Sequence, residues 1–346
     1  MSDKIPLRAI ILAAGYGTRL YPLTVDRAKP AIPFLNRPLV GYVAEYLARH
    51  GCRDVAVNLH HEGTSIRKAL GDGTRFGVNL HYTNEPEILG TGGALTNARA
   101  FLEADTFIVI NGKIITDIDL GAALETHRRT GALATLILRP NPQRERFSIV
   151  NIAPDNSIIG FGEMPTRASD NEVSLTGDLS HTAQPANPPL MFTGIQILEP
   201  AIFSYIPVQG FSHTVTDVYP QAIARGERVV AHIAEGAWYE MSTIERYLDI
   251  SLTMLRAENL SYLCGENCLL ADTAKVKDSV LWNDTVIEEG ARIDECVIGE
   301  GVRIPAHSRF HRSAIVRAEL VRGVESPPKA LPGEFIGENF VVPLPR

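Results

Sequence analysis

The sequence predicts an α/β protein in two parts, a Rossmann-like mixed sheet covered by helices followed by a short parallel β-helix. Up to about residue 240, short β-rich runs alternate with helical stretches, which indicates a mainly parallel sheet covered on both sides. Beyond residue 260 the hydrophobic period changes to six, which is typical of stacked β-helix coils. We therefore expect one domain over residues 1–250 and a second, with its tail, over 261–346.

The strands expected in the first domain are runs of aliphatic and β-branched residues. They are RAIILAAG (8–15), DVAVNLHH (54–61), NLHYTNE (79–85), TFIVINGK (106–113), LATLILRP (133–140) and SIVNIAPD (148–155). Residues 38–51 are predicted to form an amphipathic helix that ends at Gly51. Its apolar face carries Val40, Val43, Ala44 and Leu47. The polar, proline-rich segment at about 165–190 is predicted to be an insertion or flexible loop.

A helix over about 242–260 is expected to leave the first domain, and the hexad pattern follows it. One hydrophobic ladder, interrupted by Arg292, contains Val280, Val286, Ile298, Ile304 and Phe310. A neighbouring ladder contains Leu281, Ile287 and Ile293. With the nearby glycines, this pattern predicts about five coils of a parallel β-helix. An irregular β-sandwich fragment is the alternative.

Composition excludes several classes of protein. The 346-residue chain is 45% hydrophobic and 21% charged, as is typical of a globular protein with a core. A net charge of −7 argues against non-specific binding to nucleic acid or to an anionic membrane, since both require a basic surface. No apolar run reaches the ~18 residues of a membrane span, and the first run lacks a signal-peptide cleavage site. Four cysteines without CxxC spacing predict free thiols in a cytoplasmic protein.

The most informative stretch is LAAGYGTRLYPLTVDRAKP, residues 12–30. A glycine-bearing loop follows a strand, and its backbone N–H groups can turn toward phosphate oxygens. Gly15 and Gly17 allow close approach and positive φ, while Arg19 and Lys29 add positive charge suited to a triphosphate. The loop lacks the GK[ST] ending of a Walker A motif and the spacing of a dinucleotide GxGxxG motif. It therefore predicts a phosphate-binding loop of another kind.

This loop resembles that of the sugar-1-phosphate nucleotidylyltransferases, whose signature reads LAAGxGTRLxPLTxxxPKP. The chain keeps the signature except at Ala28, where the family has proline. Further matches occur in family order: KPAIPFLNRPLVGYV (29–43), EPEILGTGGAL (85–95), NGKIITDIDL (111–120), GFGEMP (160–165), FTGIQILEP (192–200) and AWYEMSTIERYL (237–248). The resemblance covers nearly the whole chain. It implies a GT-A-like nucleotidyltransferase domain followed by a left-handed β-helix, as in mannose-1-phosphate guanylyltransferase-like proteins.

The resemblance also implies an activity and a role for each matching residue. A sugar 1-phosphate would attack the α-phosphorus of a nucleoside triphosphate, with GTP and a mannose 1-phosphate-like sugar favoured. Arg19 would stabilise the leaving diphosphate, Lys29 would contact the α-phosphate, and Lys113 occupies the third catalytic position. The nucleotide would be bound by Leu12, Ala13, Ala14, Gly15, Gly17, Thr18, Gly90, Thr91, Gly92 and Gly93. The sugar would be bound by Asn111, Gly112, Glu163 and the backbone around Thr193 and Gly194.

Three departures from the family pattern fall at the expected chemical centre. Lys113 stands where the family has an aspartate that binds Mg²⁺, and an ammonium has no lone pair for a cation. Glu240 aligns with the second metal-binding aspartate, and its longer side chain makes it a weak candidate ligand. Met164 replaces a lysine that contacts the sugar phosphate in the family. The expected Mg²⁺ is therefore in doubt, and we hypothesise that Lys113 serves as an internal cation instead.

Asp117 and Asp119 are the nearest acids that could rescue a metal site. Asp119 precedes a helical pattern and is expected to cap the free N–H groups of that helix rather than bind a metal.

Two functions from different classes remain open. The chain is either a nucleotidylyltransferase with a divergent centre or a nucleotide-binding regulatory or scaffold subunit. In the second case, a homo-oligomer or a related subunit would assemble through the β-helix. An NAD-dependent Rossmann enzyme is excluded by the spacing of the front loop and by VNLHH at the end of the second strand.

Overall fold

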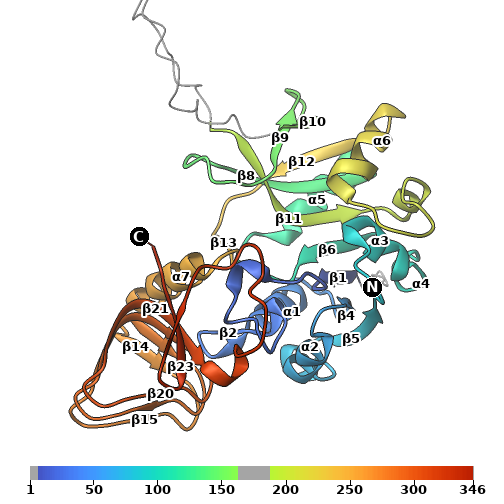
Figure 1. The fold of residues 1–346 in the computed structure, drawn as a ribbon. Coiled ribbons are helices and arrows are strands. Elements are labelled where there is room, and N and C mark those ends of the chain that lie inside the picture. Colours follow the sequence, from blue (N-terminus) through green and yellow to red (C-terminus); the bar gives the residue numbers. More distant parts are fainter. Residues whose placement is uncertain (1–6, 163–187, 346) are drawn as a thin grey trace, which may run out of the picture.

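The computed structural model of the chain describes residues 7–162 and 188–345. Figure 1 shows a large α/β domain and a β-helix, with the helix α7 between them. Most of the predicted insertion at about 165–190 lies outside the described residues, as do Glu163 and Met164.

The six runs expected to be strands are all strands of the α/β domain, with ends shifted by at most three residues, and three further strands of its sheet were not expected. The main sheet contains β1 (Arg8–Leu12), β4 (Asp54–Leu59), β5 (Asn79–Asn84), β6 (Phe107–Asn111), β8 (Ala134–Pro140), β9 (Ile149–Ile152), β10 (Ile158–Gly162), β11 (Leu190–Leu198) and β12 (Val229–Ile233). Two small ribbons pair β2 (Pro33–Phe34) with β3 (Arg37–Pro38) and β7 (Ile114–Thr116) with β13 (Trp238–Glu240).

The sheet is mixed, and its parallel centre determines where its carboxyl ends meet. Its order is β10-β9-β11-β6-β1-β4-β5, with β8 beside β11 and β12 beside β8. Strands β6, β1, β4 and β5 run parallel to one another, whereas β11 runs antiparallel to β6. The predicted mixed α/β sheet is therefore confirmed, with its antiparallel members in the half of the sheet formed later in the chain.

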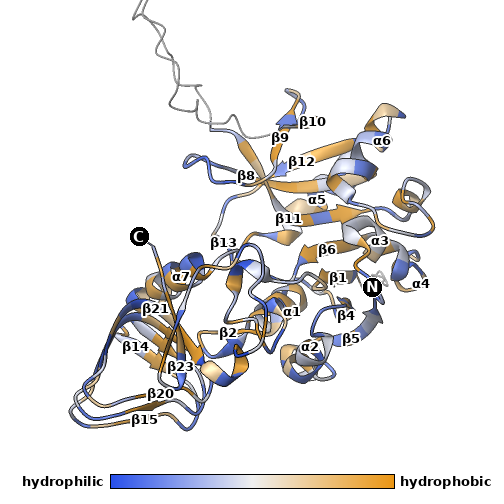
Figure 2. Cartoon of the chain, in the orientation of Figure 1, coloured by the Kyte–Doolittle hydropathy of each residue, from blue (hydrophilic) through white to orange (hydrophobic). Residues whose placement is uncertain are grey.

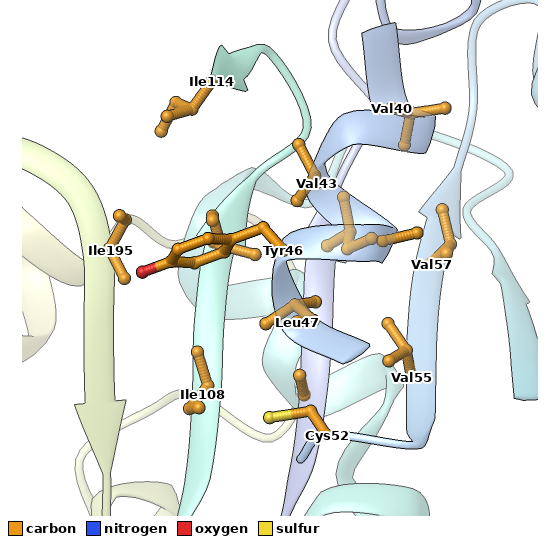
Figure 3. Packing of buried hydrophobic residues seen from close by; sticks show 14 of the residues in the cluster. Val40, Val43, Tyr46, Leu47, Cys52, Val55, Val57, Ile108, Ile114 and Ile195 are labelled. Carbon is orange, nitrogen blue, oxygen red and sulfur yellow. The ribbon is translucent and has the colours of Figure 1, made fainter. Parts of the chain in front are cut away.

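Helices cover the sheet and bury aliphatic side chains against it. They are α1 (Leu39–Arg49), α2 (Gly63–Leu70), α3 (Gly90–Asn97), α4 (Arg99–Leu102), α5 (Leu120–Thr130) and α6 (Tyr219–Ala224), whereas α7 (Ile244–Ala257) packs against the β-helix. The predicted helix 38–51 is α1, and Figure 3 shows Val43 and Leu47 pointing toward strands that carry Val55 and Ile108. All of these side chains are buried, and their removal from water is the main stabilising term for the helix.

The C-terminal part is a β-helix whose coils are 17 residues long, one fewer than three hexads. Leu281 lies beside Ile298, which lies beside Ile315, and contacts between coils join residues 17 apart. The inward-facing row at another corner is Val276, Ile293 and Phe310. The strands are β14 (Tyr262–Cys264), β15 (Leu269–Leu270), β16 (Lys275–Lys277), β17 (Ser279–Leu281), β18 (Val286–Ile287), β19 (Arg292–Ile298), β20 (Arg303–Ile304) and β21 (Arg309–Arg317), closed by β22 (Glu334–Ile336) and β23 (Asn339–Pro343).

This geometry corrects two details of the sequence prediction. The expected ladder joined Val280 to Ile298, but Val280 lies beside Val297, because the missing residue in each coil shifts the hexad phase by one. Arg292 is therefore no interruption, since the inward position belongs to Ile293. The described strands form three full coils and one further strand, fewer than the five coils expected.

The β-helix packs directly on the phosphate-loop region of the first domain. One hydrophobic cluster joins Leu20 and Tyr21 with α7 and with Trp282 and Phe340 of the β-helix. At its edge, the Arg27 guanidinium lies 2.8 Å from Glu300 and stacks over the Trp282 ring. Figure 2 shows apolar strand segments facing this junction. Among the described helices, none combines the length and apolar character required to cross a bilayer.

Candidate functional site

The parallel strands β1, β4 and β6 end side by side, and a cavity opens over their carboxyl ends. Leu12 is paired with Asn58 on one side and with Asn111 on the other. This edge of an open α/β sheet is where ligands usually bind. The cavity has a volume of about 260 Å³ and is lined by Leu12, Ala13, Ala14, Gly15, Gly17, Lys29, Pro30, Asn58, Glu85, Ile88, Gly90, Thr91, Asn111, Gly112, Lys113 and His213.

Most of the residues predicted from the sequence come together in this cavity. Those that lie outside its lining are Thr18, Arg19, Gly92, Gly93, Thr193, Gly194 and Glu240. Arg19 is exposed and close enough to Lys29 to lower that residue's pKa, so it lies near the cavity without lining it. Glu163 is outside the described residues.

The two loop glycines have different roles. Gly17 adopts φ of 68°, and a Cβ there would lie 3.0 Å from the Lys29 side chain, so glycine is required. Gly15 does not adopt positive φ, which corrects the expectation, and a Cβ there would meet nothing within 4 Å. The exposed backbone at Gly15 therefore borders open space, whereas Gly17 lets the loop pack against Lys29.

A buried chain of hydrogen bonds forms the wall beside Ala13. The Ala13 N–H donates to Asn58 Oδ1 (2.6 Å), and Asn58 Nδ2 donates to Glu85 Oε1 (2.7 Å). The other Glu85 oxygen accepts from the Leu89 N–H at 3.2 Å. The Ala13 N–H therefore has an internal partner rather than facing a ligand, and the Glu85 carboxylate, which is buried, is fixed in one orientation.

The glycine-rich start of α3 packs against the segment before α6. The N–H groups of Gly92 and Gly93 both donate to the Ser212 carbonyl, at 2.7 and 3.3 Å. A Cβ on Gly92 would lie 2.7 Å from Ser212 Oγ. These two glycines therefore serve a packing role that brings His213 to the cavity, while Gly90 and Thr91 line it directly.

The predicted sugar side is held by β6 and β11. Gly112 packs against the end of β1 and donates to the Leu12 carbonyl at 2.9 Å. The Thr193 hydroxyl donates to the Ile137 carbonyl at 2.7 Å, and its own carbonyl accepts from the Trp238 indole at 3.0 Å. Gly194 has φ of 81° in an irregularity of β11 and lies against Asn111. A sugar contact at this point would therefore involve backbone rather than the Thr193 side chain.

Two lysines, Lys29 and Lys113, line the cavity, and Arg19 lies near them. The pKa of Lys29 is lowered from 10.5 to about 7, mainly by burial and then by the nearby charge of Lys113. Glu240 opposes this effect, and Arg19 adds to it. Like charges that lower the pKa of Lys29 indicate a site suited to an anion, because a bound phosphate would relieve the repulsion.

Lys113 and Glu240 form an ion pair at the rear of the cavity. The Lys113 ammonium lies 2.9 Å from Glu240 Oε1, with side-chain exposures of 28% and 10%. Their backbones are held together because Glu240 is paired with Ile114 and the Met241 N–H donates to the Lys113 carbonyl at 3.0 Å. Lys113 lines the cavity, whereas Glu240 lies behind it.

This arrangement does not fit the Mg²⁺ implied by the family resemblance. One of the two family ligand positions holds an ammonium, and the carboxylate at the other is bound to that ammonium. Asp119 caps α5 by accepting from Gly121 and Ala122, as predicted, and Asp117 accepts from Ala237. Residues 7–162 and 188–345 contain no group of three His, Cys, Asp or Glu side chains placed to share a metal. The expected ligand role of Glu240 is therefore not supported by its surroundings.

Sequence reasoning missed several lining residues. Asn58 lies near the end of β4, and Glu85 directly follows β5. Their positions at the carboxyl edge of a parallel sheet would have identified them. His213 carries no comparable signal, because it reaches the cavity through the packing of its loop on α3.

Comparison with known proteins agrees with this geometry. The nucleotidyl transferase family model matches residues 8–257, and a GlmU-like C-terminal hexapeptide model matches residues 256–319. The fold is also similar to the crystal structure of HddC from Yersinia pseudotuberculosis, with a TM-score of 0.58 at 22% identity, over 72% of this chain and 99% of that chain.

Several curated relatives resemble the chain. It is 31% identical over 254 residues to a UTP–glucose-1-phosphate uridylyltransferase of Synechocystis, covering 70% of this chain and 61% of that protein, less than two thirds of its length. It is 28% identical over 310 residues to a mannose-1-phosphate guanylyltransferase of Mycobacterium tuberculosis, covering 86% and 81%. It is 24% identical to a glucose-1-phosphate thymidylyltransferase of Streptomyces griseus, covering 98% and 96%. The chain therefore belongs to the nucleotidyl transferase family, with a GlmU-like hexapeptide region following its nucleotidyl transferase domain.

Proposed function

We propose that this chain catalyses sugar-1-phosphate nucleotidylyl transfer. A phosphate oxygen of the sugar 1-phosphate forms a bond to the α-phosphorus of a nucleoside triphosphate. The bond from that phosphorus to the bridging oxygen breaks, and diphosphate leaves with the electron pair. The observation that carries the proposal is the cavity at the end of β1, where the signature loop, Lys29 and Lys113 surround one space. The reactions named for the three relatives support it.

The cations supply what this chemistry requires. Transfer at phosphorus depends mainly on positioning and on positive charge around the reacting oxygens. Lys29 lines the cavity and would contact the α-phosphate. Arg19 is exposed beside it and has no ion-pair partner among the described residues, so its guanidinium is available to the leaving diphosphate.

Guanine is the base we propose, and Glu85 is the reason. Guanine presents two adjacent donors, its ring N–H and its exocyclic amino group, which match the two oxygens of a carboxylate. Uracil and thymine present one N–H between two acceptors, which a carboxylate would repel. Glu85 lines the cavity and is held by Asn58 and by the Leu89 N–H. The guanylyltransferase relative, aligned over 81% of its length, supports GTP with a mannose 1-phosphate-like sugar.

Sugar recognition is proposed for the side of the cavity formed by β6 and β11. Asn111 and Gly112 line the cavity there, and the irregularity in β11 leaves backbone of Thr193 and Gly194 outside the ladder with β8. Glu163 completes the proposed set on the basis of the family resemblance.

The test is diphosphate release from GTP, UTP and dTTP with mannose 1-phosphate and glucose 1-phosphate. We expect GTP with mannose 1-phosphate to be the fastest pair and Lys29→Met to abolish release. The Lys277→Met variant is the control, because Lys277 is an exposed lysine of the β-helix. The absence of release with every pair would contradict the proposal.

A second function is favoured by the ion pair at the rear of the cavity. If the cavity with the Lys113–Glu240 pair binds nucleotide but does not support turnover, the chain is a nucleotide-binding regulatory or scaffold subunit. Calorimetric binding of GTP by a protein that releases no diphosphate would identify this case.

A further inference from the structure

We propose that the chain binds nucleotide phosphates without a divalent cation, using the Lys113 ammonium as a built-in cation that Glu240 holds in place. This inference deepens the proposed function, because it concerns the same cavity. It makes a statement about binding alone, so it can be tested whether or not the chain turns over.

The first argument is the position of the two side chains. The β7–β13 ribbon places Lys113 and Glu240 beside each other through backbone hydrogen bonds, independently of their side chains. Glu240 is only 8% exposed, and Lys113 is the only partner of its carboxylate among the described residues. A buried carboxylate without a partner is costly, so this contact fixes the ammonium in one place.

The second argument is the number of donors. An ammonium has three N–H donors and no acceptor. One donor is used by Glu240, which does not line the cavity. The remaining donors belong to a side chain that does line it. Lys113 can therefore contact phosphate oxygens while Glu240 keeps its partner, so binding leaves no buried charge unpaired.

The third argument is the charge balance. Two carboxylates and one Mg²⁺, the set implied by the family resemblance, sum to zero. Lys113 and Glu240 also sum to zero, so the exchange of the aspartate for lysine keeps the local charge while removing the need for a metal. Arg19 and Lys29 then provide the excess positive charge for the phosphates, which is the role that the family resemblance implies for them.

A consequence distinguishes this site from a metal-dependent one. Free Mg²⁺ binds the triphosphate in solution and reduces its negative charge. A site that supplies its own cations gains nothing from that metal, whereas two carboxylates would repel the triphosphate unless a cation offset their charge. Nucleotide affinity should therefore be the same or weaker in Mg²⁺ than in EDTA.

The experiment is isothermal titration calorimetry of the full chain with GTP, UTP and dTTP, each in EDTA and in excess Mg²⁺. The variants are Lys113→Met, which removes the cation, and Lys113→Asp, which places two carboxylates together. Lys277→Met is the control lysine, and thermal melts of every variant show whether it is folded.

We expect the wild type to bind its preferred nucleotide in EDTA. Lys113→Met should weaken that binding by about 10- to 100-fold, the range for one charge-assisted contact. Lys113→Asp should bind in Mg²⁺ and not in EDTA, and Lys277→Met should match the wild type. Because Lys113→Asp gains a metal dependence, misfolding cannot produce its expected result.

Two results would overturn the inference. One is wild-type binding that occurs only with Mg²⁺; diphosphate release in Mg²⁺ would then leave the proposed function standing without it. The other is equal affinity of the wild type and folded Lys113→Met in EDTA. If none of the three nucleotides binds in either buffer, the inference and the proposed function both fail.

Discussion

The two walls of the cavity differ in what they share with the family. The signature-loop wall, residues 12–17 with Lys29 and the neighbouring Arg19, keeps the residues of the motif. The lysine wall, Lys113 with its ion-pair partner Glu240, departs from the family motif at both positions, and Lys113 reverses the charge at one of them. The difference teaches that the main-chain geometry of a site can be separated from the charges of its side chains. Main-chain bonds such as Met241 N–H to the Lys113 carbonyl set that geometry, and they do not depend on which side chain is attached.

The largest expected effect concerns the signature-loop wall. Arg19→Ala removes a preorganised cation at the leaving diphosphate and should lower the rate of diphosphate release by about 10²–10³. Arg49→Ala, an exposed arginine at the end of α1, is the matched control and should leave the rate unchanged. Steady-state rates with GTP and mannose 1-phosphate measure both. A loss below threefold in Arg19→Ala would show that this wall does not act on the leaving group.

The next prediction separates the cavity from the β-helix. Ile298 is fully buried between neighbouring coils, so Ile298→Ala should lower the free energy of unfolding by about 2–5 kcal/mol. Ile298→Val should cost about 0.5–1.5 kcal/mol. Thermal melts of the full chain would show both shifts, and GTP affinity measured below the transition should be unaffected. A parallel loss of GTP affinity would mean that the coil stack supports the cavity through the junction.

Base recognition provides the third prediction. Glu85→Gln removes the carboxylate charge that we propose recognises guanine, while the amide of the new side chain can still contact Asn58. We expect the ratio of GTP to UTP affinities to fall by about 10- to 100-fold. Glu87→Gln, two residues away and exposed, is the control. Titration of each variant with both nucleotides gives the ratio, and an unchanged ratio in Glu85→Gln would exclude a role in choosing the base.

The smallest effect is a pH dependence. The pKa of Lys29 in the free protein is about 7, because of burial and the neighbouring Lys113. Phosphate binds the protonated form, so binding raises this pKa and takes up a proton. Metal-free GTP affinity should therefore fall as pH rises above about 7, by at most tenfold per pH unit. Lys29→Arg stays charged and should flatten the profile between pH 7 and 9. Identical slopes for the two proteins would assign the dependence to another group.

Sequence patterns predicted the elements of the α/β domain well, because each depends on local periodicity. In residues 38–51 the apolar residues recur every three to four positions, as on one face of a helix, and α1 covers 39–49. The β-helix was predicted, but the predicted hydrophobic ladder is shifted by one residue from the observed stacking between coils. A coil of 17 residues keeps the hexad spacing within a coil and breaks it between coils, as at Leu281 and Ile298. Only the stacking of one coil on the next reveals that shift.

The candidate site was predicted where it depends on a continuous motif and missed where it depends on tertiary contacts. The loop from Leu12 to Gly17 and Lys29 was recognised as one stretch. Lys113 and Glu240 were each recognised as departures, but nothing in the sequence shows that two residues 127 positions apart form one ion pair. The pairing of β7 with β13 brings them together, and that contact turns two unexplained substitutions into one charge-balanced exchange.

The most direct measurement of the account is the ratio of wild-type nucleotide affinities in Mg²⁺ and in EDTA, taken with the tightest of the three nucleotides. If Lys113 is the cation of the site, the affinity in EDTA equals or exceeds that in Mg²⁺. An affinity more than tenfold tighter in Mg²⁺ would contradict the account, because it would require a metal at the position that the Lys113–Glu240 pair occupies.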